Sequence, residues 1–264
     1  MYWTSRGAKL YFSVQGQGLP VLCLPPFPFN HAFYSRQSAL VDAARLILVD
    51  YPGTGRSAEA REVSLELLAQ DVTALLDALG LDRVVTLGVS LGGYVALALC
   101  ALAPQRVMGL VLADTRSEAD PPEAVLQRAQ TAEELKQKGA GVLKERVSRL
   151  FGATTHREQP ELVRAAQALV EREHAQGLAQ LSLAMGQRPD RSALLASIRC
   201  PTLVLCGAED TVTPPAGMEQ LAAAVPGAVF RQIPRAGHLA AQEQPEAFNQ
   251  AVRNFLQRMS LHGA

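Results

Sequence analysis

The feature that most constrains this chain is the stretch Val84–Ala98, in which an apolar, β-branched run passes directly into a run rich in alanine and leucine. The first run is typical of a buried strand and the second of a helix. Between them the sequence is Gly-Val-Ser-Leu-Gly, with the serine at position 90. This order at a strand-to-helix turn is the signature of a nucleophile elbow, in which the serine hydroxyl projects from the sheet.

The glycines of the turn have a physical purpose. A serine at so tight a bend takes a sparsely populated backbone conformation, and side chains at Gly88 and Gly92 would collide across the turn. Because the helix begins at Ser90, its free N–H groups and the positive end of its dipole lie where an oxyanion would form. Short matches of this kind also occur by chance in structural turns, so the rest of the chain must decide between the two interpretations.

Length and charge narrow the classes of function. The 264 residues are enough for one sizeable domain with room for an inserted subdomain. Lysine plus arginine and aspartate plus glutamate both total 25, so the formal charge is zero and the electrostatics do not favour nucleic acid. No apolar run approaches a membrane span, and Met1–Val14 lacks the apolar core of a signal peptide. We therefore expect a cytoplasmic protein that binds neither nucleic acid nor membrane, with its oligomeric state left open.

Cysteine and histidine spacing gives no indication of a metal site. The four cysteines lack Cys-x-x-Cys spacing and are expected to be reduced thiols of the core: Cys23, Cys100, Cys200 and Cys206. Four of the five histidines are scattered without ligand-like pairing, and no role is assigned to them: His31, His156, His174 and His262.

Strands and helices alternate along most of the chain. Short apolar runs predict strands at residues 9–14, 19–24, 45–50, 84–87, 106–113, 201–207 and 228–233. Amphipathic or alanine-rich runs predict helices at 64–79, after Ser90, up to Val225 and at 245–259. Repeated units of this kind form a doubly wound, mostly parallel sheet that is covered on both faces, so the fold class is α/β.

The pattern changes between residues 116 and 191, a stretch called here the inserted segment. Helical runs rich in alanine, glutamate, glutamine and arginine replace the alternation. We predict a helical cap at 116–191 over a core formed by 1–115 and 192–264. Periodic apolar residues in it could line a pocket, but we expect most of them to pack the cap: Leu150, Leu162, Leu169, Leu178, Leu181, Leu183 and Met185.

Four candidate functional side chains follow predicted strands, and in a doubly wound sheet such loops share one edge. A serine hydroxyl needs a base beside it, and the base needs a carboxylate to fix its tautomer. His238 follows the last strand in a loop preceded by glycine, which favours it as the base over a role in capping the final helix. Asp210 and Asp114 both follow strands, and Asp210 is favoured because it ends a Gly-x-x-Asp loop after its strand and fits the chain order Ser-Asp-His. Its neighbour Glu209 is expected to be solvated.

An oxyanion hole needs two donors aimed at the developing negative charge. The Leu91 amide at the start of the helix is one candidate. The other should come from the loop after residues 19–24, where Phe27 is flanked by prolines that lack an N–H. The alternative is that this loop is only a proline-rich turn.

The chain resembles the α/β-hydrolase superfamily over nearly its whole length. The residues that carry the resemblance are Asp50–Ser57, Gly88–Gly93, Gly207–Asp210 and Gly237-His238; Leu110–Thr115 and Gln242–Asn249 are similar to the enol-lactonase-like or carboxylesterase-like subgroup. The resemblance implies an eight-stranded sheet, a helical cap and hydrolysis without a cofactor. One departure is that Pro25-Pro26 stands where the family usually has His-Gly.

Together these features predict a serine hydrolase that cleaves a small, rather apolar carboxylic ester or lactone through an acyl-enzyme. Ser90, His238 and Asp210 would be catalytic, and the amides of Phe27 and Leu91 would hold the oxyanion. One alternative is a cofactor-free haloperoxidase or perhydrolase with the same residues. Another is a non-catalytic ligand-binding protein on the same fold.

Overall fold

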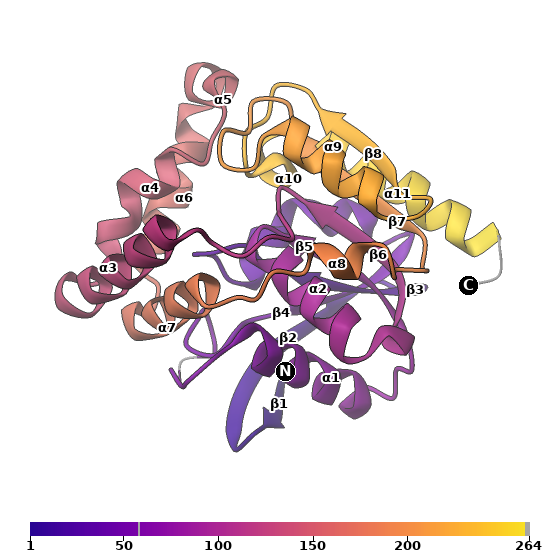
Figure 1. Ribbon diagram of the computed structural model, residues 1–264, viewed down its shortest axis with the longest axis horizontal. Coiled ribbons are helices and arrows are strands. Elements are labelled where there is room, and N and C mark those ends of the chain that lie inside the picture. The colour runs from indigo at the N-terminus through magenta and orange to yellow at the C-terminus, as the bar shows by residue number, and fades with distance from the viewer. Residues whose placement is uncertain (58, 262–264) are drawn as a thin grey trace.

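One eight-stranded sheet forms the centre of the computed structural model, which describes residues 1–57 and 59–261 (Figure 1). The strand order is β1-β2-β4-β3-β5-β6-β7-β8, and pairing is antiparallel only for β1 with β2 and for β2 with β4. The predicted mostly parallel sheet is thus confirmed. The strands are β1 (Tyr2–Ser5), β2 (Ala8–Gln15), β3 (Leu19–Leu24), β4 (Ala44–Val49), β5 (Val84–Val89), β6 (Val107–Ala113), β7 (Thr202–Gly207) and β8 (Val229–Ile233).

The apolar runs of the sequence predict seven of these strands and omit β1. This strand has only four residues, of which Tyr2 is exposed and Trp3 is buried. It turns into β2 through Arg6 and Gly7, both with positive φ. An isolated half-buried segment of this length lacks enough alternating positions to identify a strand.

The direction of the crossovers decides which helices cover which face. The β3-to-β4 connection contains the 3-10 helix η1 (His31–Leu40) and crosses the sheet in one direction. The later connections cross in the other direction and contain α1 (Leu65–Ala78), α2 (Leu91–Leu102) with η2 (Pro104–Arg106), and α9 (Pro215–Ala224). Right-handed crossovers in opposite directions lie on opposite faces. After α10 (Ala240–Glu243), α11 (Pro245–Leu261) packs against η1 and therefore shares its face.

The innermost strands supply the centre of the core. Every residue of β5, β6 and β7 is buried, as expected for parallel strands covered on both sides. Helix α1 adds an apolar face, and Ser64 begins it by accepting a hydrogen bond from the Leu67 amide at 3.2 Å. Within residues 1–57 and 59–261, no helix has both the length and the apolar composition needed to cross a membrane.

The connection between β6 and β7 is helical. It contains α3 (Pro122–Lys138), η3 (Ala140–Leu143), α4 (Lys144–Ser148), α5 (Ala153–Glu158), α6 (Pro160–Glu171), α7 (Ala175–Gly186) and α8 (Ser192–Leu195). Helices α3 to α7 gather on one side of the sheet, at the left of Figure 1, with α3 packed on α7 and α4 on α6.

The apolar residues of the inserted segment have different environments. Leu178 and Leu181 are buried, whereas Leu169 remains 50% exposed. Leu150 and Met185 line a cavity that also contains Ser90. Packing therefore holds for most of these positions and not for Leu169, and Leu150 and Met185 both pack in the core and line the cavity.

Candidate active site

Ser90 occupies the turn between β5 and α2 in a conformation that few residues adopt. Its φ is 52° and its ψ is −113°, and the first turn of α2 follows at once. A Cβ on Gly88 would run into the carbonyl of Gly92, and a Cβ on Gly92 would run into the backbone of Leu24 in β3. Only glycine fits at these two positions, because the serine is pressed between the helix and the neighbouring strand.

Hydrogen bonds fix this turn to the end of β6. The Ser90 amide donates to the Ala113 carbonyl at 2.9 Å, and the Thr115 hydroxyl donates to the Ser90 carbonyl at 2.8 Å. A Cβ on Gly93 would meet the Thr115 side chain, so this glycine makes room for the second bond. The hydroxyl of Ser90 is left to point away from the sheet.

A hydrogen-bonded chain joins three of the predicted residues. His238 Nε2 lies 2.9 Å from Ser90 Oγ, and His238 Nδ1 lies 2.9 Å from Asp210 Oδ2. These residues follow β5, β7 and β8, so their side chains meet at the carboxyl edge of the sheet. His238 and Asp210 are each 3% exposed, which shields the pair from water.

Asp210 is surrounded by donors. Its Oδ1 accepts from the amides of Val212 at 2.7 Å and Thr213 at 3.0 Å, and its Oδ2 accepts from the Thr213 hydroxyl at 2.5 Å. Burial alone would raise the pKa of Asp210, but the hydrogen bond and charge of His238 and the bonds from Thr213 outweigh it and lower the pKa. The carboxylate therefore stays ionised where it faces the imidazole.

Thr213 is a member of the site that the sequence interpretation missed. Its hydroxyl lies 3.2 Å from His238 Nδ1 and also donates a hydrogen bond to Asp210 Oδ2. An aspartate whose side chain accepts from amides two and three residues later forms a local turn. The spacing Asp210-Thr-Val-Thr213 is a signal that could have identified it.

Asp114, the other candidate acid, does not contact His238. Its Oδ1 accepts from the Gly207 amide at 2.8 Å and its Oδ2 from the Ala240 amide at 3.3 Å. Burial, followed by the nearby charge of Asp210, raises the pKa of Asp114 well above its ordinary value. The side chain therefore ties the end of β7 to the start of α10.

Asp114, Asp210 and Cys206 are the group in the described chain whose ligand atoms lie close enough to hold a metal ion, all within 4.8 Å of one another. Backbone amides, Thr213 and His238 already use both carboxylates. Burial also raises the pKa of the Cys206 thiol, which keeps it protonated. The grouping is explained by the hydrogen bonds of the two loops.

Glu209 differs from the prediction that it is solvated. Its two oxygens accept from the hydroxyl and the amide of Thr154, at 2.5 and 2.8 Å. These bonds lower the pKa of Glu209. The sequence could not show this contact, because Thr154 lies in the inserted segment, far away along the chain.

Glu243 makes a second connection between the inserted segment and the histidine loop. Its Oε1 accepts from the amides of Gly237 at 2.9 Å and Leu239 at 3.1 Å, on either side of His238. Its Oε2 accepts from the Gly152 amide at 2.8 Å and the Thr155 hydroxyl at 2.6 Å. The side chain is buried and every oxygen is paired, so it fixes the loop that carries the imidazole.

The two amides expected to form an oxyanion hole are both unused. Among the described residues, neither the Phe27 N–H nor the Leu91 N–H has a recorded hydrogen-bond acceptor. Phe27 lines the same cavity as Ser90, and Leu91 is the first residue of α2. Donors left free beside a serine hydroxyl and a helix N-terminus suit an anion.

The cavity at Ser90 has a volume of about 240 Å³ and lies between the sheet edge and the inserted segment. Its apolar part includes Phe27, Leu143, Val147, Leu150 and Met185. Polar and charged side chains from the loop after β6 and from α3, α4 and α7 complete it: Arg116, Asp120, Arg128, Thr131, Arg146 and Ser182. A molecule bound in this cavity would contact both apolar side chains and several arginines.

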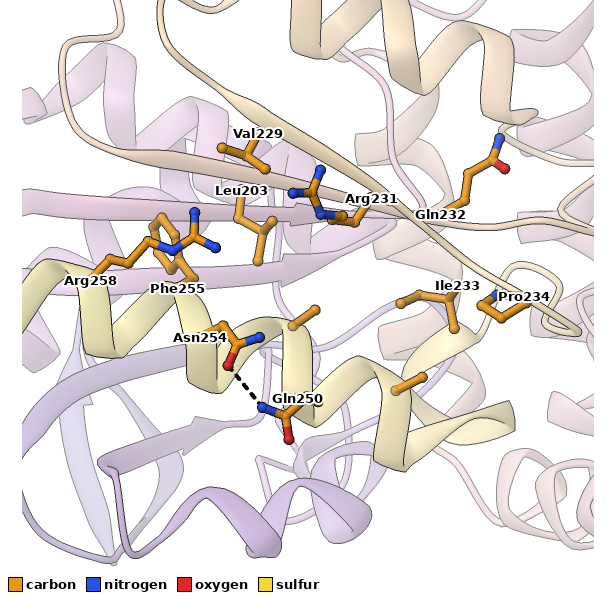
Figure 2. A pocket seen from close by; sticks show the side chains of 12 residues that line it. Leu203, Val229, Arg231, Gln232, Ile233, Pro234, Gln250, Asn254, Phe255 and Arg258 are labelled. Carbon is orange, nitrogen blue, oxygen red and sulfur yellow. Dashed lines mark hydrogen bonds between the residues drawn. The ribbon is translucent and has the colours of Figure 1, made fainter.

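A second cavity, of about 300 Å³, lies between α11 and the edge strand β8 (Figure 2). Gln250 donates to Asn254 at 2.8 Å on its helical side. None of Ser90, Asp210 and His238 lines it. The two cavities are thus separate, and Ser90 and His238 line the first.

The remaining histidines and the cysteines lie outside this hydrogen-bonded chain. His31 Nδ1 lies 2.7 Å from Asp50, whereas His156 and His174 lie against the backbone carbonyls of Ser148 and Gly55. His262 falls outside the described residues. The cysteines are free thiols, and three of them are buried: Cys23, Cys100 and Cys206, with Cys200 half-buried.

Relatives with similar sequences are enzymes by name. The chain is 32% identical to the 2-hydroxy-6-oxononadienedioate/2-hydroxy-6-oxononatrienedioate hydrolase of Paraburkholderia phymatum, covering 85% of this chain and 81% of that protein. It is 29% identical to the Mycobacterium tuberculosis protein named "putative non-heme bromoperoxidase", covering 80% and 82%.

Solved structures match over almost the whole chain. The esterase from Thermogutta terrifontis, with malate bound, has a TM-score of 0.94 and 36% identity, covering 98% of this chain and 97% of that one. The enol-lactonase from Burkholderia xenovorans LB400 has a TM-score of 0.89 and 26% identity, covering 97% and 100%. The family described as the alpha/beta hydrolase fold matches residues 20–245. The chain is therefore a member of the α/β-hydrolase superfamily, as its sequence motifs predict.

Proposed function

We propose that this chain is a serine hydrolase that cleaves a small carboxylic ester or lactone. The observation that carries the proposal is the continuous hydrogen-bonded chain from Ser90 Oγ through His238 to Asp210, with 2.9 Å at each step. Esterases and an enol-lactonase among the similar structures support the same class of reaction. Because the nucleophile, the base and the carboxylate are all present, the geometry suits acyl transfer.

In the first half of the reaction, the Ser90 hydroxyl attacks the carbonyl carbon of the substrate. His238 Nε2 accepts the hydroxyl proton while the Ser90 oxygen forms its bond to carbon. Asp210 holds the Nδ1–H of the imidazole and stabilises the positive charge that develops on it. Collapse of the tetrahedral intermediate breaks the bond to the leaving oxygen, which takes the proton from His238. An acyl-enzyme and an alcohol result.

In the second half, water attacks the acyl-enzyme. His238 removes a proton from the water and returns it to the Ser90 oxygen as the acyl bond breaks. The products are the carboxylic acid and the free enzyme. With a lactone the alcohol and the acid remain in one molecule, so the same two steps yield a hydroxy acid, or, from an enol lactone, an enol that tautomerises to a keto acid.

The negative oxygen of each tetrahedral intermediate would lie between the amides of Phe27 and Leu91. Both N–H groups lack an acceptor among the described residues, and the positive end of the α2 dipole points at the same place. Loss of one such donor typically costs about 100- to 1,000-fold in turnover. The prolines around Phe27 hold this donor in position without competing N–H groups.

We propose that residues 116–191 act as a cap that encloses the substrate. Residues of α3, α4 and α7 line the cavity from the side opposite Ser90, and the volume of about 240 Å³ suits a small acyl group. Hydrogen bonds donated to Glu209 and Glu243 hold the Gly152–Thr155 part of this segment beside His238. A closed cavity would exclude bulk water from the ionised intermediates.

Replacement of Ser90 by alanine tests the proposal. We expect Ser90→Ala to lower kcat for a p-nitrophenyl ester by about four to six orders of magnitude, and a fluorophosphonate probe to label only the wild type. Ser38→Ala, an exposed serine on η1, is the matched control and should keep full activity. Unchanged hydrolysis by Ser90→Ala would refute the nucleophile, and failure of the wild type to react with the probe would favour a binding protein on this fold.

A second candidate function is perhydrolysis, which the similarity to a named bromoperoxidase favours. Hydrogen peroxide would replace water at the acyl-enzyme, and the product would be a peracid that can oxidise a halide. Peracid formation from acetate and peroxide, measured beside ester hydrolysis, separates the two functions. A ratio of peracid to acid far above that of a typical esterase would support the second.

A further inference from the structure

The cavity at Ser90 has an excess of positive charge. Three arginines line it, namely Arg116, Arg128 and Arg146, against the single carboxylate of Asp120. Arg146 is compensated from outside the cavity, because its Nη2 lies 3.2 Å from Glu134. Arg116 has no carboxylate partner within the described chain and contacts only the carbonyl of Val212. Arg116 therefore contributes one unpaired positive charge, and the rest of the balance inside the cavity depends on Asp120 and Arg128.

Asp120 is already shared by a second arginine. Its Oδ1 lies 2.7 Å from Arg188 Nη2, and its Oδ2 accepts from Arg128 Nε at 3.1 Å. The side chains of Arg188 and Asp120 are only 2% and 3% exposed, and the guanidinium of Arg188 stacks on Tyr94 at 4.3 Å. Burial alone would raise the pKa of Asp120, but the two arginines outweigh it and lower the pKa. One carboxylate thus contacts two guanidinium groups, of which Arg188 also acts on the exposed Asp190, whereas Arg128 has no further carboxylate contact among the described residues.

The uncompensated charge lies on the guanidinium of Arg128, whose two terminal nitrogens form a fork. Arg128 donates to protein only through Nε, so Nη1 and Nη2 have no acceptor among the described residues. The first carbons of the Arg128 side chain lie close to Gly186 of α7, where an added Cβ would meet Arg128 Cβ and Cγ at 3.3 and 3.4 Å. The two terminal nitrogens of a guanidinium match the two oxygens of a carboxylate and bind them with parallel hydrogen bonds.

We propose that the substrate carries a carboxylate in addition to the acyl group that is cleaved, and that Arg128 binds it. This inference rests on the proposed hydrolysis at Ser90 and names the substrate class: short esters or lactones derived from dicarboxylic acids. The carboxylate supplies the anion that the cluster of Arg128, Asp120 and Arg188 lacks. Arg116, which lines the same cavity, adds to the attraction. The cavity of about 240 Å³ leaves room for only a few carbon atoms between the two groups.

A pair of esters that differ in one group tests the inference. The p-nitrophenyl monoester of glutaric acid has a carboxylate where p-nitrophenyl pentanoate has a methyl group. We expect wild type to prefer the first by at least about tenfold in kcat/KM, since a charged hydrogen bond is worth about that much. In Arg128→Gln this ratio should fall by about 10- to 100-fold, through KM more than kcat. Arg128→Lys, which keeps the charge and loses the fork, should fall less.

Arg164→Gln is the matched control, because Arg164 is an exposed arginine on α6 that does not line the cavity. It should leave the ratio unchanged. A binding readout guards against misfolding of the Arg128 variants: glutarate should slow fluorophosphonate labelling of Ser90 in wild type and Arg164→Gln, and not in Arg128→Gln. Rising salt should weaken this protection.

The outcomes separate the two proposals. If Ser90→Ala hydrolyses both esters as fast as wild type, the proposed function fails. If Ser90→Ala is inactive while the wild type prefers the neutral ester, or Arg128→Gln leaves the ratio unchanged, only the carboxylate subsite is overturned.

Discussion

Asp114 and Asp210 end neighbouring parallel strands, β6 and β7, and are 0% and 3% exposed. The pKa of Asp114 lies well above its ordinary value, whereas that of Asp210 lies below it. Asp114 accepts from two backbone amides, at 2.8 and 3.3 Å. Asp210 accepts from two amides, a hydroxyl and the imidazole of His238.

The difference teaches that burial alone does not decide which carboxylate can serve a base. Both aspartates lose water, which penalises the charged form at each. At Asp210 the surrounding donors, one of them able to carry a positive charge, more than restore the lost hydration. At Asp114 they do not, and the charge of Asp210 opposes ionisation further. One carboxyl group is therefore suited to stabilise a cation and the other to hold two loops together.

Replacing each aspartate by asparagine, which removes its charge, is the strongest test of the difference between Asp210 and Asp114. We expect Asp210→Asn to lower kcat/KM by about 10,000-fold, because the amide can hold the wrong tautomer of His238. Asp114→Asn is the matched change one strand away and should stay within about threefold, since Asp114 does not touch the imidazole. Steady-state kinetics with a small ester measures both. An equal loss in the two variants would contradict the assignment of Asp210.

Glu243 extends the comparison to a carboxylate that acts only through the backbone around His238. Glu243→Gln replaces an acceptor by a donor facing N–H groups, which leaves buried amides unpaired at about 1–3 kcal/mol each. We expect a clearly lower Tm and a fall of about 10- to 100-fold in kcat, as the loop at Gly237 and Leu239 loosens. Thermal unfolding and kinetics should change together. A large rate loss with an unchanged Tm would instead indicate direct contact with substrate.

Thr213 sharpens the comparison at Asp210 itself. Its hydroxyl donates to Asp210 at 2.5 Å, and a charged hydrogen bond of this kind is worth about 1.5–3 kcal/mol. Thr213→Val should therefore lower kcat by about tenfold or somewhat more, whereas Thr213→Ser, which keeps the hydroxyl, should recover most of it. If valine and serine behave alike, the packing of the side chain matters and the hydroxyl does not.

The smallest effect on turnover is expected at Asp114. Its contribution to stability should change with pH in the direction opposite to that of Asp210. A carboxyl group whose folded pKa is raised stabilises the fold fully below its unfolded pKa of about 3.8, and this stability is lost as the pH rises through the folded pKa. Each unit of raised pKa is worth about 1.4 kcal/mol. Asp114→Asn lacks this loss, so its stability relative to wild type should increase as the pH rises above about 3.8.

Urea unfolding at a series of pH values measures this difference. A constant offset between Asp114→Asn and wild type over the whole range would contradict the raised pKa. Asp210 should behave in the opposite way, because a lowered folded pKa gives stability that is present above about pH 3.8 and is lost on acidification.

Much of the site could be predicted from the sequence because its candidate catalytic residues lie in short local motifs. Ser90 lies in a glycine-flanked turn, and Asp210 and His238 each follow a strand in a short loop, so chain order and topology brought them to one edge. Strand β1 and the role of Glu209 were not predictable in this way. The first has too few residues to show a period, and the second depends on Thr154 in the inserted segment.

The arrangement of arginines at the cavity could not be predicted from the sequence either. Arg128, Asp120 and Arg188 lie on different parts of a helical segment, and nothing in their spacing indicates that they meet. Their arrangement depends on how α3 packs on α7, which is a tertiary contact. The residues proposed to select the substrate therefore lie in no short motif, whereas those proposed to break the bond lie in motifs that the sequence shows clearly.

The bonds of Glu243 limit how this enzyme could be redesigned by exchanging one helical insertion for another. A transplanted segment would have to bring a glycine to position 152, where any Cβ would meet Glu209 and the Gly237 amide, and a hydroxyl to position 155. Without both, the exchanged segment would disturb the loop that carries His238, although Ser90, Asp210 and His238 would all still be present in the sequence. Chimaeras of this family should therefore keep residues 152–155 with the core and place their junctions beyond them.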